Sequence, residues 1–137
     1  MYLSGGMSGL SFEEQTKWRS QIKNAILYGG YEYDFKPVFF DPTMKYNFEE
    51  KRHKSEHEIF EYDLNALRKS DLVIVNFNRP NSLGTSMELA IAHEHRIPIV
   101  GLYEDGGELH PWLIEMTTRI CESKEELVEY IVEFFLK

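Results

Sequence analysis

Two short apolar runs flank an amphipathic segment in the middle of the chain. Residues 72–77 (LVIVNF) and 97–102 (IPIVGL) predict strands that are buried on both faces. Between them, residues 84–92 carry apolar side chains at helical rather than strand spacing. A strand, a helix and a second strand in this order predict a β-α-β unit, whose crossover makes the two strands parallel. Ligands of such sheets bind at the carboxyl ends of the strands.

The same alternation extends to both ends of the chain. Further strands are predicted at residues 1–4, 37–40 and 118–121, and further helices at residues 11–30, 56–69, 112–116 and 123–135. No repeat or linker interrupts this order. We therefore expect one domain over residues 1–137, with an α/β fold. The expected architecture is a three-layer, doubly wound (flavodoxin/Rossmann-like) sandwich with about five parallel strands.

Two of the predicted helices begin with a capping signal. Ser11 lies three residues before Glu14, and Ser123 lies three residues before Glu126. In a capping box the serine side chain accepts from a backbone N–H of the first turn, while the acidic side chain accepts from the N–H of the serine. These pairs define the expected starts of the first and last helices.

Composition limits the classes of partner. With 137 residues, 42% of them hydrophobic, the chain can bury the core of one domain. A net charge of −8 without a basic stripe argues against a nucleic-acid polymer as partner, whereas a single nucleoside or nucleotide remains possible. Cys121 is the one cysteine, which is compatible with a reducing compartment. No apolar run reaches the ~20 residues that cross a bilayer. We expect a cytoplasmic protein without a membrane partner.

Two acidic residues are candidates for chemistry. Glu88 follows a loop, residues 81–85, that offers hydroxyls and backbone N–H groups at a helix start, a natural site for an anion or a hydroxyl. Asp63 shares a helical face with apolar residues. Each has a simpler interpretation: Asp63 as an ion pair or surface charge, and Glu88 as a favourable charge near a helix start, worth typically ~0.3–1 kcal/mol. The loop before Glu88 favours the chemical interpretation.

Two other motifs carry less information. The segment from His53 to His57 fits H-x-x-E-H, a zinc-peptidase pattern, but a zinc site also needs a third protein ligand, and we interpret the match as accidental. The glycine-rich turn at residues 5–9 does not have the G-x-G-x-x-G spacing of dinucleotide folds. A ligand-binding turn and a plain tight turn are both compatible with it.

Three segments together resemble one family of enzymes. They are Y-L-S-G-G-M-S-G at residues 2–9, E-Y-D-L-N-A-L-R-K-S-D at residues 61–71, and S-L-G-T-S-M-E-L-A-I-A at residues 82–92. Over nearly its whole length the chain is similar to the nucleoside 2-deoxyribosyltransferase family. The third segment is the most specific, because G-T-x-x-E-L/I after a strand and a loop is the nucleophile signature of that family.

The resemblance implies roles for individual residues. Glu88 matches the nucleophilic glutamate that attacks C1′ of a 2′-deoxynucleoside, Tyr2 the tyrosine that orients it, and Asp63 the aspartate that exchanges a proton with the base. A nucleophilic carboxylate also suits the physical chemistry, because cleavage of an N-glycosidic bond develops oxocarbenium character at C1′. The substrate-binding residues implied are Gly5, Gly6, Met7, Ser82, Gly84, Thr85 and His110.

The resemblance leaves the branch of the family open. Ser82 stands where transferases often have an aspartate, and it resembles the serine that binds the 5′-phosphate in the related 2′-deoxynucleoside 5′-phosphate N-hydrolases. Gly6 stands where that branch tends to have a serine, and His110 aligns roughly with a position that reaches the site of a neighbouring subunit. Base exchange on deoxynucleosides is the leading expectation. Hydrolysis of a nucleoside 5′-monophosphate is the alternative, and a non-catalytic nucleotide-binding module is a third.

The resemblance also implies the partners. They are a small nucleoside or nucleotide, a free nucleobase, and further copies of the chain in a homo-oligomer with shared active sites. The mechanism requires no metal and no cofactor.

Overall fold

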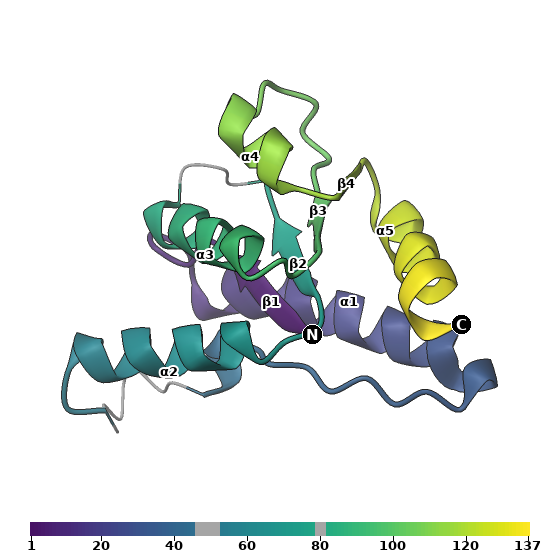
Figure 1. Cartoon of the computed structure of the whole chain (residues 1–137), viewed down its shortest axis with the longest axis horizontal. Helices are drawn as coiled ribbons and strands as arrows, with labels where there is room; N and C mark the ends of the chain where they lie inside the picture. The colour runs from purple at the N-terminus through teal and green to yellow at the C-terminus, as the bar shows by residue number, and fades with distance from the viewer. Residues whose placement is uncertain (46–52, 79–81) are drawn as a thin grey trace.

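The computed structural model describes residues 1–45, 53–78 and 82–137. A four-stranded parallel sheet lies at the centre of these residues (Figure 1). The strands lie in the order β1-β2-β3-β4. Their bounds are Tyr2–Gly5 for β1, Val73–Asn76 for β2, Ile99–Leu102 for β3 and Arg119–Cys121 for β4. The predicted α/β class and the parallel sheet are confirmed.

The expected strand at residues 37–40 is wrong, so the sheet has four strands rather than five. Only Phe40 pairs, in an isolated parallel bridge with Tyr2: its N–H donates to the Met1 carbonyl at 2.8 Å, and its carbonyl accepts from the Leu3 N–H at 3.0 Å. Pro37 has no N–H to donate. Asp41 already caps the 3₁₀-helix Pro42–Met44, which ends the extended backbone.

The isolated bridge still reveals the topology. Because Tyr2 bonds to Leu72 on its other side, Phe40 lies on the edge of β1 away from β2. The chain therefore extends the sheet outward from β1 and then returns to add β2, β3 and β4 on the opposite side. This reversal between β1 and β2 is a topological switch point, where ligands of open α/β sheets bind.

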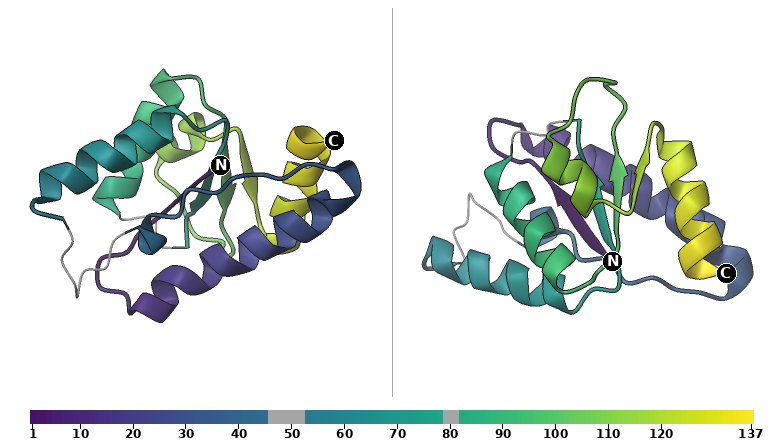
Figure 2. Two further views of the ribbon diagram at one scale, coloured as in Figure 1. Left: turned by 90° about the horizontal axis from the view of Figure 1, so that it is seen from below. Right: turned by 45° about the horizontal axis from the view of Figure 1, so that its top comes forward.

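Helices cover both faces of the sheet. One face packs against α1 (Phe12–Gly30) and α5 (Lys124–Ile131). The other packs against α2 (Glu56–Arg68), α3 (Leu83–Glu94) and α4 (Pro111–Met116). Figure 2 shows α3 and α4 on one side of the strands and α5 on the other. The predicted three-layer arrangement is therefore correct.

Strand alternation decides which residues of β1 face which layer. Leu3 belongs to the core between the sheet and α1, whereas Tyr2 belongs to the core under α2 and α3. Successive side chains of a strand point to opposite faces, so Ser4 lies on the same face as Tyr2. Two hydroxyl-bearing side chains thus lie side by side on the face of the sheet that packs against α3.

The two expected capping boxes differ in outcome. At Ser11 both reciprocal bonds with Glu14 are present. At Ser123 the side chain accepts from the Glu126 N–H at 3.1 Å, but the Glu126 carboxylate accepts from the Glu122 N–H at 2.9 Å instead of closing the box. The serine-to-glutamate spacing therefore predicted where both α1 and α5 begin. The full capping box forms only at the start of α1.

A buried cluster of charged side chains lies next to the carboxyl end of β1. Arg19 of α1 is fully buried and donates to the Gly5 carbonyl at 3.0 Å. Its Nε lies 3.7 Å from an oxygen of Asp41, and the Lys23 ammonium donates to the other oxygen at 2.9 Å. Asp41 is 5% exposed. One buried carboxylate therefore compensates a buried guanidinium and a half-buried ammonium.

Replacing Asp41 by asparagine should lower the free energy of unfolding by about 3–5 kcal/mol, because the variant removes the carboxylate that pairs with the buried Arg19. Urea unfolding measures the change. The control is Glu133→Gln, which breaks the exposed pair with Lys137 and should cost less than about 1 kcal/mol. An Asp41→Asn protein as stable as this control would contradict the expectation.

Within the described residues, no helix combines the length and the apolar character that a membrane span needs.

Candidate active site

Glu88 is held by two hydroxyl groups at the carboxyl edge of the sheet. The Tyr2 hydroxyl donates to Glu88 Oε1 at 2.9 Å, and the Ser4 hydroxyl donates to Glu88 Oε2. Tyr2 and Ser4 are 0% and 1% exposed, whereas Glu88 is partly exposed. Each carboxylate oxygen thus has a buried donor, and the residue as a whole is partly exposed.

The periodicity of α3 explains why Glu88 points at the sheet. The helix begins after Ser82, whose hydroxyl accepts from the Thr85 N–H at 3.3 Å. Thr85, Leu89 and Ala92 form its buried stripe. Glu88 lies between Thr85 and Ala92 at helical spacing, and therefore on this stripe. A carboxylate on the buried face of a helix needs polar partners, which β1 supplies.

Several groups influence the ionisation of Glu88. Burial is the largest effect and raises the pKa of this carboxyl. The hydrogen bonds from Ser4 and then Tyr2 act in the opposite direction, as does the positive charge of Arg19. The negative charge of Asp63 on α2 raises the pKa further. The net result is a pKa above the ordinary value for a glutamate.

The raised pKa couples the charge of Glu88 to folding. A carboxyl whose pKa is raised by folding binds its proton more tightly in the native state than in the unfolded chain. Its contribution to stability is complete below the unfolded-state pKa of about 4.3 and is lost as the pH rises through the native-state pKa. At neutral pH the ionised Glu88 therefore lowers the free energy of unfolding.

Glu88→Gln should consequently raise the free energy of unfolding at pH 7 relative to the wild-type protein, and this difference should shrink near pH 4. The amide oxygen can accept from one hydroxyl, and the amide nitrogen can donate to the other. Urea unfolding at both pH values measures the effect. Glu94→Gln, at an exposed position of the same helix, is the control and should show no such dependence. A Glu88→Gln protein that is less stable at both pH values would contradict this account.

Tyr2 is fixed from its other side by aromatic packing. Its ring stacks on Phe40, with centroids 5.2 Å apart and an angle of 12° between the planes. Phe40 in turn contacts Tyr62 of α2 at a centroid distance of 5.7 Å. The isolated bridge at Phe40 therefore holds the tyrosine ring in place while its hydroxyl reaches Glu88.

The glycine-rich turn follows β1 at the same edge. Gly5 has no room for a side chain, because a Cβ there would lie 2.9 Å from the Trp18 ring. The Met7 carbonyl accepts from the Leu10 N–H and from the Gln15 side chain, both at 3.1 Å. These bonds fix the course of the turn that follows β1.

The remaining predicted binding residues lie at two helix starts. Ser82, Gly84 and Thr85 form the first turn of α3, the turn before Glu88; Gly84 is exposed and Thr85 is buried. His110 is exposed and caps α4, where its Nδ1 accepts from the Trp112 N–H at 3.2 Å. Across residues 1–45, 53–78 and 82–137, no hydrogen bond or ion pair joins His110 to Glu88. The structure thus brings Tyr2 into contact with Glu88 and puts Asp63 within range of its charge, and it shows no such contact for His110 among these residues.

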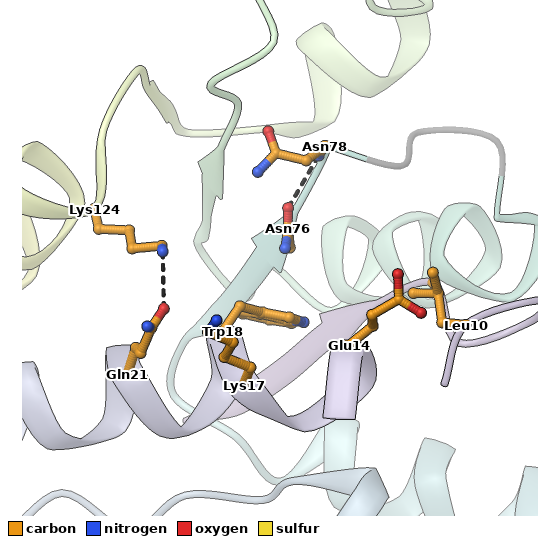
Figure 3. A pocket seen from close by; sticks show the side chains of 9 residues that line it. Leu10, Glu14, Lys17, Trp18, Gln21, Asn76, Asn78 and Lys124 are labelled. Carbon is orange, nitrogen blue, oxygen red and sulfur yellow. Dashed lines mark hydrogen bonds between the residues drawn. The ribbon is translucent and has the colours of Figure 1, made fainter. Parts of the chain in front are cut away.

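A cavity of about 410 Å³ opens at the ends of β1 and β2, on the α1 side (Figure 3). Its lining includes Gly6, Trp18 and Asn76. A hydrogen bond of 2.8 Å from Lys124 to Gln21 crosses from α5 to α1 on its wall. Gly6 is the only one of the predicted site residues in this lining, so the cavity is separate from the Glu88 carboxylate.

The H-x-x-E-H segment, from His53 to His57, runs into the start of α2. The His53 ring lies 3.9 Å from the Glu56 carboxylate. In the part of the chain that the structure describes, no three His, Cys, Asp or Glu side chains are grouped so that they could hold a metal ion.

Almost the whole chain matches the model of one protein family. The family model for nucleoside 2-deoxyribosyltransferase matches residues 1–135. The chain therefore belongs to the nucleoside 2-deoxyribosyltransferase family, as its motifs indicated. Members of this family are glycosyltransferases or N-glycosidases, which act on nucleosides or nucleotides and release free bases. A search of curated protein sequences found no match.

Two solved structures have the same fold. A conserved protein from Enterococcus faecalis V583 superposes with a TM-score of 0.78 at 17% sequence identity, covering 97% of this chain and 98% of the other. The CMP N-glycosidase BcmB from Clostridium botulinum superposes with a TM-score of 0.61 at 15% identity, covering 98% and 100%. At these identities the likeness establishes the fold alone.

Proposed function

We propose that this protein cleaves the N-glycosidic bond of 2′-deoxynucleosides and transfers the deoxyribosyl group to another base. The observation that supports this proposal is the Glu88 carboxylate, which the Tyr2 and Ser4 hydroxyl groups hold at both oxygens and which lies close enough to Asp63 for the two carboxyl groups to interact. A helix-surface charge would need neither hydroxyl. A nucleophile that must keep one orientation benefits from both.

The proposed reaction has two steps. In the first, an oxygen of the ionised Glu88 attacks C1′ while the bond from C1′ to the base nitrogen breaks. The bonding electron pair leaves with the base, which takes a proton from the Asp63 carboxyl group. The negative charge of Glu88 stabilises the oxocarbenium character that develops at C1′. The product of this step is a glycosyl ester on Glu88 and a free, neutral base.

The second step returns the enzyme to its starting state. A nitrogen of an incoming base attacks C1′, the ester bond breaks, and the electron pair returns to the Glu88 carboxylate. The proton displaced from the incoming base passes to Asp63, which again carries the proton for the next cycle. Tyr2 donates its hydrogen bond throughout and keeps the carboxylate in register with C1′.

A hydrolase is the second candidate, and two observations favour it. Ser82 and the exposed backbone of Gly84 lie at the start of α3, where N–H groups can bind the phosphate of a nucleoside 5′-monophosphate. One protein of the same fold is a CMP N-glycosidase. In this version water replaces the incoming base in the second step, and the products are a free base and a sugar 5-phosphate.

Incubation with deoxyinosine and free adenine separates the two candidates. Base exchange should form deoxyadenosine and release hypoxanthine, both measured by chromatography. Base released from a deoxynucleoside 5′-monophosphate, with no deoxyadenosine formed, would overturn the transferase in favour of the hydrolase. Binding of a nucleotide in calorimetry without any base release over hours would overturn both and identify a binding module.

A further inference from the structure

Ser4 is a polar side chain in the middle of a buried strand. It is 1% exposed and lies between Leu3 and Gly5 in β1, paired in register with Val75 of β2. Serine side chains are usually exposed. Leaving a buried hydroxyl without a partner costs about 1–3 kcal/mol. The Ser4 hydroxyl has one proton, and it donates that proton to Glu88.

The two donors act on different oxygens of Glu88. Tyr2 binds Oε1 and Ser4 binds Oε2. The last torsion of a glutamate side chain is broad, so one hydrogen bond holds one oxygen and leaves the plane of the carboxylate free to turn. A second bond on the other oxygen fixes that plane. Tyr2 alone therefore does not account for a single orientation of the carboxylate.

We propose that Ser4 is a positioning residue, which holds the second oxygen of the Glu88 carboxylate so that the group keeps one orientation toward C1′. This proposal rests on the proposed function. The Ser4 side chain would act through Glu88 and would not touch the substrate. The hydroxyl groups of Ser4 and Tyr2 both favour the ionised form of Glu88, and so does the positive charge of Arg19. Burial and the negative charge of Asp63 oppose it. The orientation and the charge of the nucleophile therefore depend on the same contact.

The test compares Ser4→Ala and Ser4→Cys with the wild-type protein. Ser4→Ala should lower kcat by about 10- to 100-fold with little change in KM, because a misplaced nucleophile slows the chemical step but not binding. The acid limb of the pH profile of kcat/KM should move to higher pH. Ser4→Cys keeps the size and offers a weak S–H donor, so it should restore part of kcat.

A matched control and a measurement without substrate complete the test. Ser70→Ala removes another hydroxyl, one that donates to the Ala66 carbonyl at 2.9 Å, and should leave kcat and the pH profile unchanged. Carbon NMR of the free protein measures the pKa of Glu88, and the Glu88→Gln variant assigns its signal. This pKa should rise in Ser4→Ala. Urea unfolding reports separately on stability.

The outcomes are distinct. A folded Ser4→Ala protein with wild-type kcat and acid limb would overturn the proposal and leave Ser4 with a structural role, even if its stability falls. An unchanged Glu88 pKa in Ser4→Ala would also overturn it. A wild-type protein with no glycosidic activity overturns the proposed function, and the NMR titration then still decides whether Ser4 holds the carboxylate.

Discussion

Replacement of Glu88 by alanine should lower the rate of base release from a deoxynucleoside by at least about 10³-fold, because the variant has no group that can form a bond to C1′. Substrate binding should change much less than kcat, since the loss falls on the chemical step. Steady-state rates measured by chromatography of the released base give the effect. Trapping of a glycosyl adduct on the wild-type protein, followed by mass spectrometry, should locate it on Glu88.

The control for Glu88→Ala lies on the same helix. Glu94 is exposed at the end of α3, and Glu94→Ala should retain wild-type turnover. Full turnover by a folded Glu88→Ala protein would reject both the transferase and the hydrolase, since each needs the carboxylate at C1′.

Asp63→Asn should lower the rate of base release by about 10²–10⁴-fold, because an amide cannot supply the proton that makes the departing base neutral. The size of the loss should depend on the leaving group. A 7-methylpurine deoxynucleoside already carries a positive charge on its base and leaves without protonation. Asp63→Asn should therefore cleave this methylated substrate at a rate close to that of the wild-type protein.

This comparison of two substrates distinguishes proton transfer from a general disturbance of the site. Glu61→Gln, at an exposed position on the same helix α2, is the control and should leave both rates unchanged. Equal losses of rate on the ordinary and the methylated substrate would argue against proton transfer by Asp63.

The periodicity of the sequence predicted most of the fold. Buried parallel strands are near-continuous apolar runs, and helices carry apolar residues at helical spacing, so β2, α3 and β3 were found from local pattern alone. The error at residues 37–40 arose because an apolar run predicts a strand whether or not its backbone groups find partners. Pro37 lacks a donor and Asp41 begins a turn, and both limit pairing to Phe40.

The candidate site was predicted only as far as its motifs extend. The signature around Glu88 and the motif around Asp63 are local in sequence. Ser4 was missed because the predicted strand at residues 1–4 was interpreted only as an apolar start, although the position of Ser4 two residues after Tyr2 puts both side chains on one face. Arg19 was missed because a single arginine on a helix looks like a solvated charge. Only the tertiary structure places it under Gly5.

The isolated bridge at Phe40 also makes the outer border of the sheet its weakest part. Among the described residues, this border is held by two backbone bonds at Phe40, a bond from the amino-terminal ammonium to the Val38 carbonyl and one ring stack, whereas β1 and β2 share a full ladder. Local opening of proteins begins where such protection is thin. Detachment of this border would release the Tyr2 ring while the rest of the molecule stays folded. Loss of turnover should therefore precede global melting on heating, and the Phe40 amide should exchange with deuterium sooner than the amides of β2.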